Sequence, residues 1–189
     1  QGVIAFLGTG PLWQSGIYRY ANGHISLVVN EKTPLTHGAG YFQAFGSPSM
    51  LANNGIGFWA RGRQKQEGLF QADAHNLLRM MVNTNTPIPN GQGYFQSFPS
   101  ASFARTSKKP NMAFIGKGGN HQTGIYLLAS GKLKRIADTN TPLSNGVGFF
   151  TGFHDVRLND AGRAIVFIGE GILSQQGIFY YNGQVITKI

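Results

Sequence analysis

The fold is decided by residues 112–150, which have the sequence MAFIGKGGNHQTGIYLLASGKLKRIADTNTPLSNGVGFF. Three apolar segments follow one another here, and a few glycine-rich or polar residues separate each from the next. Gly and Asn accommodate tight turns, whereas Ile, Tyr and Phe favour strands. The stretch therefore predicts three consecutive strands, followed by a longer connection through Thr141 and Pro142.

The same pattern occurs four times along the chain. Its first segment is centred on Phe6, Phe58, Phe114 and Phe167, at spacings of 52, 56 and 53 residues. Ten residues after each Phe, a glycine begins the second segment, which reads Gly16-Ile17-Tyr18, Gly68-Leu69-Phe70, Gly124-Ile125-Tyr126 and Gly177-Ile178-Phe179. A period of this length is typical of repeat folds in which one supersecondary unit recurs.

The rest of the repeat also keeps its order. A third apolar segment follows a turn such as Asn22-Gly23, Ser130-Gly131 or Asn182-Gly183, a strong hairpin signal. A Thr-Pro pair then precedes a Gly-x-Gly motif and two aromatic residues: Tyr41-Phe42, Tyr94-Phe95 and Phe149-Phe150. We expect a fourth strand after them, around residues 47–51, 100–104 and 155–158.

Three hairpin-linked strands and one long crossing are typical of β-propeller blades. We predict an all-β fold, a small β-propeller of about four blades of roughly 53 residues, forming one domain over residues 1–189. The repeats span approximately 3–55, 56–111, 112–162 and 163–189. The first blade lacks its inner strand in this order, so either N-terminal residues have been removed, or this blade has three strands, or another chain fills the sheet edge. A β-solenoid and a stack of β-sandwich modules are the alternatives.

Composition restricts the chemistry. The absence of cysteine excludes disulfides and thiolate metal sites, and no apolar run approaches the roughly 18 residues of a membrane span. Gln1-Gly2-Val3 opens directly on a strand, so we expect that a leader has been removed or that the chain was cut from a longer one. The net charge of +9 favours polyanions, although a basic surface also serves solubility.

One segment resembles a known family. Residues Ile136-Ala137-Asp138-Thr139-Asn140-Thr141-Pro142, then Gly146-Val147-Gly148-Phe149-Phe150, resemble the repeat of secreted, propeller-like bacterial proteins found mostly in cyanobacteria and planctomycetes. The resemblance covers nearly the whole chain and implies a secreted or surface-anchored β protein without an established activity. At Asn30-Glu31-Lys32 the Asp and following Asn of the motif are missing, which weakens a metal-loop interpretation.

The candidate ligand-binding residues come from the repeated loops. A Gln occurs two residues before each second segment, where its amide can pair with the backbone of the neighbouring long loop. Alternatively, these amides form a repeated pocket with Trp13 and the exposed member of each aromatic pair. The candidates are Gln14, Gln66, Gln122, Gln175, Trp13, Tyr41, Tyr94 and Phe149.

Other motifs favour structural roles. Gly8-Thr9-Gly10, Gly116-Lys117-Gly118 and Gly169-Glu170-Gly171 precede no helix, so we predict turn glycines there and no phosphate loop. Asn30, Asn83 and Asp138 are expected to cap turns, with calcium as the alternative. The five His are not spaced as metal ligands are. His154, Asp155 and Asp160 have no Ser or Cys nucleophile beside them. Basic residues near the turns form either one positive patch or ordinary solvated turn charges; they are Arg105, Lys108, Lys109, Lys132, Lys134 and Arg135.

The sequence thus predicts a non-enzymatic, secreted or cell-surface binding module, lectin-like, with repeated sites on one face. No catalytic residue, metal or cofactor is predicted. The expected partners are a glycan or an acidic polysaccharide, and a protein partner or second copy. Nucleic acid is disfavoured because no stacking-aromatic pattern accompanies the basic residues. A structural or protein-interaction propeller within a surface layer or larger assembly is the alternative.

Overall fold

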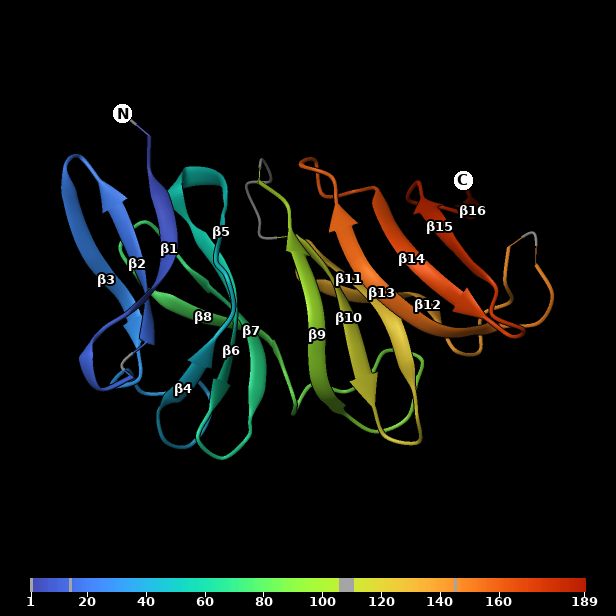
Figure 1. The fold of residues 1–189 in the computed structure, drawn as a ribbon, viewed down its shortest axis with the longest axis horizontal. Helices are drawn as coiled ribbons and strands as arrows, with labels where there is room; N and C mark the ends of the chain where they lie inside the picture. Colours follow the sequence, from blue (N-terminus) through green and yellow to red (C-terminus); the bar gives the residue numbers. More distant parts are fainter. Residues whose placement is uncertain (1, 14, 106–110, 145) are drawn as a thin grey trace. The chain divides into compact units, whose positions relative to one another are not determined.

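A computed structural model describes residues 2–13, 15–105, 111–144 and 146–189, and Figure 1 shows it as a ribbon. Antiparallel strands dominate the described residues, which contain no α-helix and two 3-10 turns, at Pro11–Trp13 and Ala52–Asn54. The strands form four sheets, which we call blades 1 to 4 in chain order. The prediction of four repeated β units is confirmed.

Residues 1–84 form one compact unit, which contains blades 1 and 2. Blade 1 consists of β1 (Ile4–Thr9), β2 (Ser15–Ala21) and β3 (His24–Asn30). Blade 2 has the order β4-β6-β7-β8, with β5 also paired to β6. Its strands are β4 (Phe42–Phe45), β5 (Ser49–Met50), β6 (Ile56–Gly62), β7 (Glu67–Ala72) and β8 (Leu78–Asn83).

Residues 85–189 form the second compact unit, which contains blades 3 and 4. Blade 3 consists of β9 (Phe95–Phe103), β10 (Met112–Gly118), β11 (Thr123–Ala129) and β12 (Lys132–Asp138). Blade 4 consists of β13 (Phe150–Leu158), β14 (Ile165–Gly171), β15 (Gln176–Tyr181) and β16 (Ile186–Lys188). The prediction of one domain over residues 1–189 stays a prediction, because the chain divides into these two compact units.

Blade 1 has three strands in the described residues, whereas an inner strand pairs with β6, β10 and β14 in the other blades. This is the difference that the repeat order predicts. The turns at Asn22-Gly23 and Ser130-Gly131 connect outer strands, and all four residues have positive φ, as the hairpin interpretation requires.

The inner strands begin earlier than expected. β9 and β13 start at the second aromatic residue of each pair and run through residue 103 or 158, and β4 likewise starts at Phe42. Register shifts at β-bulges interrupt the pairing, for example between His154 and Val156, where Asp155 has a φ of 45°. A bulge breaks the two-residue alternation by which a strand is recognised in sequence, which explains the late prediction.

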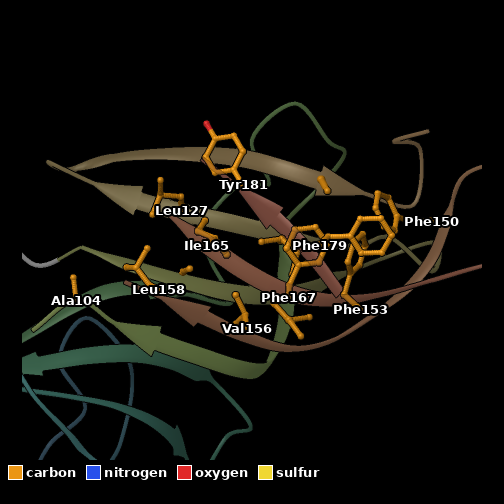
Figure 2. Close-up of a cluster of buried hydrophobic side chains, with 14 of the residues drawn as sticks. Ala104, Leu127, Phe150, Phe153, Val156, Leu158, Ile165, Phe167, Phe179 and Tyr181 are labelled. Atoms are coloured by element: carbon orange, nitrogen blue, oxygen red, sulfur yellow. The ribbon is translucent and has the colours of Figure 1, made fainter. Parts of the chain in front are cut away.

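Each complete blade contains a cluster of aromatic rings. In blade 3, Phe114 stacks on Tyr126 with ring centroids 5.6 Å apart, and Phe95 meets Tyr126 edge-on at 4.8 Å. Blade 4 repeats this geometry with Phe167, Phe179 and Phe150 (Figure 2). The inner-strand ring therefore joins two rings supplied by the middle strands.

The prediction that the glycines of the Gly-x-Gly motifs at residues 8, 116, 118, 169 and 171 lie in turns is wrong. Gly8, Gly116, Gly118, Gly169 and Gly171 lie within strands. A Cβ at Gly169 would lie 2.5 Å from the Phe150 ring, and a Cβ at Gly116 would overlap Phe95. The sequence did not reveal this role, because the ring arrives from a different strand.

Candidate functional site

The candidate site lies where two loops of one blade meet. One is the crossing loop that leads into each inner strand, at residues 31–41, 85–94 and 139–149. The other is the hairpin loop at residues 63–66, 119–122 and 172–175. We call this end of blades 2, 3 and 4 the rim.

Backbone hydrogen bonds close every crossing loop in the same way. The N–H groups of Leu35, Ile88 and Leu143 donate to the carbonyls of Gly40, Gly93 and Gly148 at 2.9, 3.1 and 2.9 Å. These three glycines have φ values of 85°, 69° and 81°, which a residue with a side chain rarely adopts. The Gly-x-Gly motif is therefore a turn that fixes the shape of the rim.

An apolar side chain anchors each crossing loop to the hairpin loop. Leu35, Ile88 and Leu143 are buried, and each packs against the glycine that ends the neighbouring strand. A Cβ at Gly62 would lie 3.1 Å from Leu35, and a Cβ at Gly171 would lie 3.1 Å from Leu143. We did not predict these anchors, although an apolar residue after every Thr-Pro was a signal for them.

Two of the repeated Gln side chains contact the crossing loop. Gln122 Oε1 accepts a hydrogen bond from Gln92 N, and Gln175 Oε1 accepts one from Val147 N, both at 3.4 Å. The donors are the central residues of the Gly-x-Gly turns. This agrees with the structural interpretation of the Gln, in which the amide pairs with the backbone of the long loop.

The other two Gln positions differ. Gln66 Nε2 donates to Gln64 Oε1 at 3.4 Å within its own loop, and its buried Oε1 has no hydrogen-bond partner in the described residues. Gln14 lies outside the described residues, as does the side chain of Trp13. The structure thus brings the repeated Gln to the crossing loop in blades 3 and 4.

The aromatic pairs divide as the sequence predicted. Phe42, Phe95 and Phe150 are buried in the blade cores. Their neighbours Tyr41, Tyr94 and Phe149 are exposed by 46%, 57% and 53% at the rim. An isolated β-bridge within each crossing loop fixes the backbone of the exposed aromatic residue. The bridges join Pro34 to Tyr41, Pro87 to Tyr94 and Pro142 to Phe149.

The predicted turn caps at Asn30 and Asp138 are present. Asn30 Oδ1 accepts hydrogen bonds from Lys32 N at 3.0 Å and from Thr33 Oγ1 at 3.2 Å. Asp138 Oδ1 accepts from Asn140 N and Thr141 Oγ1, both at 3.0 Å. Within the described residues, no three His, Asp or Glu side chains gather as a metal site would require.

Asp138 and Tyr126 are two buried polar residues of blade 3, and their side chains differ in how fully they are hydrogen-bonded. Burial, followed by the nearby Asp138 charge, raises the pKa of Tyr126 to about 12. The Tyr126 hydroxyl is buried and has no hydrogen-bond partner in the described part of the chain. The equivalent residues of blades 2 and 4 are Phe70 and Phe179.

We therefore expect Tyr126→Phe to stabilise the protein by about 1 kcal/mol, because it removes an unsatisfied buried hydroxyl. Urea unfolding monitored by circular dichroism at pH 7 measures the difference. The raised pKa adds a pH test, because between about pH 10 and 12 Tyr126 ionises in the unfolded chain but stays protonated in the folded one, so the parent protein should lose stability relative to Tyr126→Phe as the pH rises towards 12. A destabilised Tyr126→Phe variant would show that the hydroxyl has a partner.

Two residues of the candidate basic patch are hydrogen-bonded to other parts of the second unit. Arg135 donates to the Asn90 carbonyl at 2.9 Å and to Asp138 Oδ2 at 2.6 Å, and so belongs with the rim loops. Lys134 Nζ donates to the Tyr181 hydroxyl at 2.9 Å. Lys108 and Lys109 lie outside the described residues. Arg63, Lys65 and Lys117, by contrast, are exposed in or beside hairpin loops of the rim.

The His154 and Asp155 side chains are engaged separately. His154 Nε2 lies 2.9 Å from Glu170 Oε1, and Asp155 Oδ1 lies 2.6 Å from Arg157. All four side chains are substantially exposed. The bulge at Asp155 separates the His154–Glu170 contact from the Asp155–Arg157 contact. This agrees with the surface and turn roles expected for His154 and Asp155.

A polar cavity of about 400 Å³ in the first unit was not predicted. Arg19 and Asn76 lie among its lining residues. The Arg19 guanidinium donates to the carbonyls of Ala74 and Asp73, and burial lowers its pKa. Asn76 Nδ2 donates to the Leu27 carbonyl at 3.0 Å, so these residues join blades 1 and 2. Arg19 was the sequence signal for this cavity, because the other repeats have Gln71, Leu127 and Tyr180 at the equivalent position.

Family comparison covers almost the entire chain. Residues 1–186 match the family of unknown function DUF7453. The chain belongs to this family. No curated protein matches the chain. No helix in the described residues is long and apolar enough to cross a membrane.

Two solved structures are similar to this DUF7453 member. TolB from Acinetobacter baumannii matches 98% of the chain with a TM-score of 0.58 and 15% identity. The chain spans 40% of the length of TolB. The β-propeller domain of the Trilobed protease from Pyrococcus furiosus matches 99% of the chain and is itself covered by 68%, with a TM-score of 0.43 and 10% identity. The predicted β-propeller fold, with four blades, is confirmed.

Proposed function

We propose that this protein is a non-catalytic, secreted binding module whose rim binds acidic polysaccharide. The observation that supports the proposal most is the combination of rigid loops and exposed rings. Every crossing loop is closed by backbone hydrogen bonds and anchored by a buried side chain, yet Tyr41, Tyr94 and Phe149 remain about half exposed. A ring held in place in this way binds at low entropic cost.

Each component of the rim suits a saccharide. An aromatic face packs against the apolar side of a sugar ring, and a Gln amide such as that of Gln122 or Gln175 can donate to hydroxyl groups. The exposed Arg63, Lys65 and Lys117 suit carboxylate or sulfate groups. Weak equivalent sites on one chain gain avidity for a polymer that carries the same unit many times.

Retention on immobilised heparin and on immobilised alginate tests this function. We expect Tyr94→Ala to weaken binding about fivefold, because an aromatic contact contributes about 1 kcal/mol. Combining it with Tyr41→Ala and Phe149→Ala should abolish retention. Retention should also fall with salt, since exposed charges are screened.

The matched control is Tyr180→Ala, because Tyr180 is a similarly exposed tyrosine on β15, at 37%, away from the rim loops. It should retain the polysaccharide like the parent protein. Equal losses for Tyr94→Ala and Tyr180→Ala, or full retention by the triple variant, would refute a rim site. Melting temperatures of all variants separate lost binding from lost folding.

One observation favours a protein partner as the second candidate. At the blade 4 rim, four apolar side chains are exposed, namely Val147 by 68%, Phe149 by 53%, Ile172 by 43% and Leu173 by 87%. The equivalent blade 3 residues are Gln92, Tyr94, Gly119 and Asn120. Loss of a co-purifying protein in Leu173→Ser, with unchanged polysaccharide retention, would support this alternative.

A further inference from the structure

The polar cavity between blades 1 and 2 lies away from the rim. Both blades belong to the first compact unit. In blade 2, β7 begins directly after the hairpin loop 63–66 of the rim and ends directly before the turn at residues 73–77, which lines the cavity. A strand of this length spans about 20 Å, so the cavity and the rim lie at opposite ends of the blade.

Arg19 is a buried cation at this cavity, with an exposure of 7%. Its Nη1 donates to the Ala74 carbonyl and its Nη2 to the Asp73 carbonyl. Its buried Nε has no hydrogen-bond partner in the described residues. None of the ion pairs between described residues includes Arg19. Since buried charges are normally paired, the free Nε indicates a place for an anion.

The nearby Asp73 carboxylate does not occupy that place. Its Oδ1 accepts hydrogen bonds from the backbone N–H groups of His75 and Leu77, at 2.8 and 2.9 Å, within its own turn. Asp73 therefore contacts the Arg19 guanidinium through its backbone carbonyl, and its carboxylate acts on Arg19 only as a nearby charge. The Arg19 Nε remains available to a carboxylate from outside the protein.

Asn76 has a second unsatisfied atom at the same cavity, and this atom is an acceptor. The Asn76 Nδ2 donates to the Leu27 carbonyl at 3.0 Å, which fixes the orientation of the amide. Its Oδ1 is buried and has no hydrogen-bond partner in the described part of the chain. A ligand hydroxyl can donate to it and recover the cost of the unpaired acceptor. Further polar groups line the cavity at Asn22, Ser26 and Asn54.

We propose that this cavity binds a small organic acid that also has hydroxyl groups. The ligand carboxylate accepts a hydrogen bond from Arg19 Nε, and a ligand hydroxyl donates to Asn76 Oδ1. The cavity volume of about 400 Å³ lies within the range of about 300–1,000 Å³ for small-molecule sites. Every polar lining residue lies inside blades 1 and 2, between residues 19 and 76. This site is separate from the rim, and either site can exist without the other.

NMR of the arginine side chains in the isotope-labelled protein tests the site, with gluconate as the probe. The Nε–H resonance of Arg19 should shift and saturate as gluconate is added, whereas that of the exposed Arg157 should not move. Sorbitol, which has a CH₂OH group in place of the carboxylate, should bind about tenfold more weakly or worse, because a hydrogen bond to an ionised acceptor is roughly twice as strong. Both ligands are added to the parent protein, so its fold is the same in the two titrations.

A matched pair of substitutions confirms the location. Arg19→Lys keeps the positive charge but removes Nε, so it should weaken gluconate binding about tenfold or more. Arg157→Lys makes the same change at an exposed arginine of blade 4 and should leave gluconate binding unchanged. The backbone amide spectrum shows whether Arg19→Lys is folded, and the comparison of gluconate with sorbitol decides the question if it is not.

Three results would overturn the proposal. Equal affinities for gluconate and sorbitol would show that no carboxylate is recognised. An unmoved Arg19 Nε–H resonance with both gluconate and the smaller acid lactate would show that the cavity holds water only. Gluconate shifts confined to the rim loops 31–41 and 63–66 would assign the binding to the rim. A heparin oligosaccharide should shift the rim loops and leave the Arg19 resonance in place, so failure of one site is seen separately from failure of the other.

Discussion

Phe95→Ala is expected to lower the free energy of unfolding by about 3–5 kcal/mol, the range for truncating a fully buried aromatic ring. Phe95 is exposed by 1%, and its ring contacts Phe98 and Phe114 as well as Tyr126, at centroid distances of 5.4, 5.6 and 4.8 Å. Its removal also leaves a cavity over Gly116, which has no side chain to fill it. The midpoint of urea unfolding measures the loss.

The control for Phe95→Ala is its sequence neighbour. Tyr94 lies at the rim with 57% exposure, so Tyr94→Ala should change stability by less than about 0.5 kcal/mol. The two substitutions therefore separate the buried member of the aromatic pair from the exposed one. Similar losses from both would contradict this division of roles.

Asp138→Ala is expected to cost about 2–4 kcal/mol. The Asp138 side chain is exposed by 1%, and its carboxylate accepts hydrogen bonds from Asn140 N, Thr141 Oγ1 and Arg135. Truncation leaves these donors without their partner, and an unpaired buried donor loses its full solvation energy. Urea unfolding at pH 7 again provides the measurement.

Asp138→Asn separates the turn cap from the ion pair. Asn30 caps the equivalent turn of blade 1 with its own Oδ1, so an Asn at residue 138 should keep the bonds to Asn140 and Thr141. Only the charge-assisted bond from Arg135 is weakened, and we expect less than half the loss of Asp138→Ala. If both variants lose the same stability, the Arg135 pair is the main contribution and the cap is minor.

Much of the fold could be predicted from sequence because its signals are local. The Asn22-Gly23 turn, the spacing from Phe114 to Gly124 and the three-stranded first blade all follow from residues near one another in the chain. The rim could also be predicted, because a meander places the hairpin loop and the crossing loop at the same end. The bond between Gln122 and Gln92 N shows this convergence in blade 3.

The features that escaped prediction depend on contacts between strands distant in sequence. The role of Gly116 is set by Phe95, which reaches it from the neighbouring strand. The carbonyl partners of Arg19 lie 54 and 55 residues away. Gln66 departs from the pattern of Gln122 because it pairs with Gln64, which the other copies lack.

The central claim, a polysaccharide site at the rim, is tested most directly by mapping backbone amide shifts. A titration of isotope-labelled protein with a heparin oligosaccharide, followed by NMR, reports each amide separately. We predict shifts concentrated in the crossing loops 31–41, 85–94 and 139–149 and in the hairpin loops 63–66, 119–122 and 172–175. Shifts confined to the opposite ends of the blades, around Asn22-Gly23 and Ser130-Gly131, or no shifts at saturating oligosaccharide, would contradict the claim.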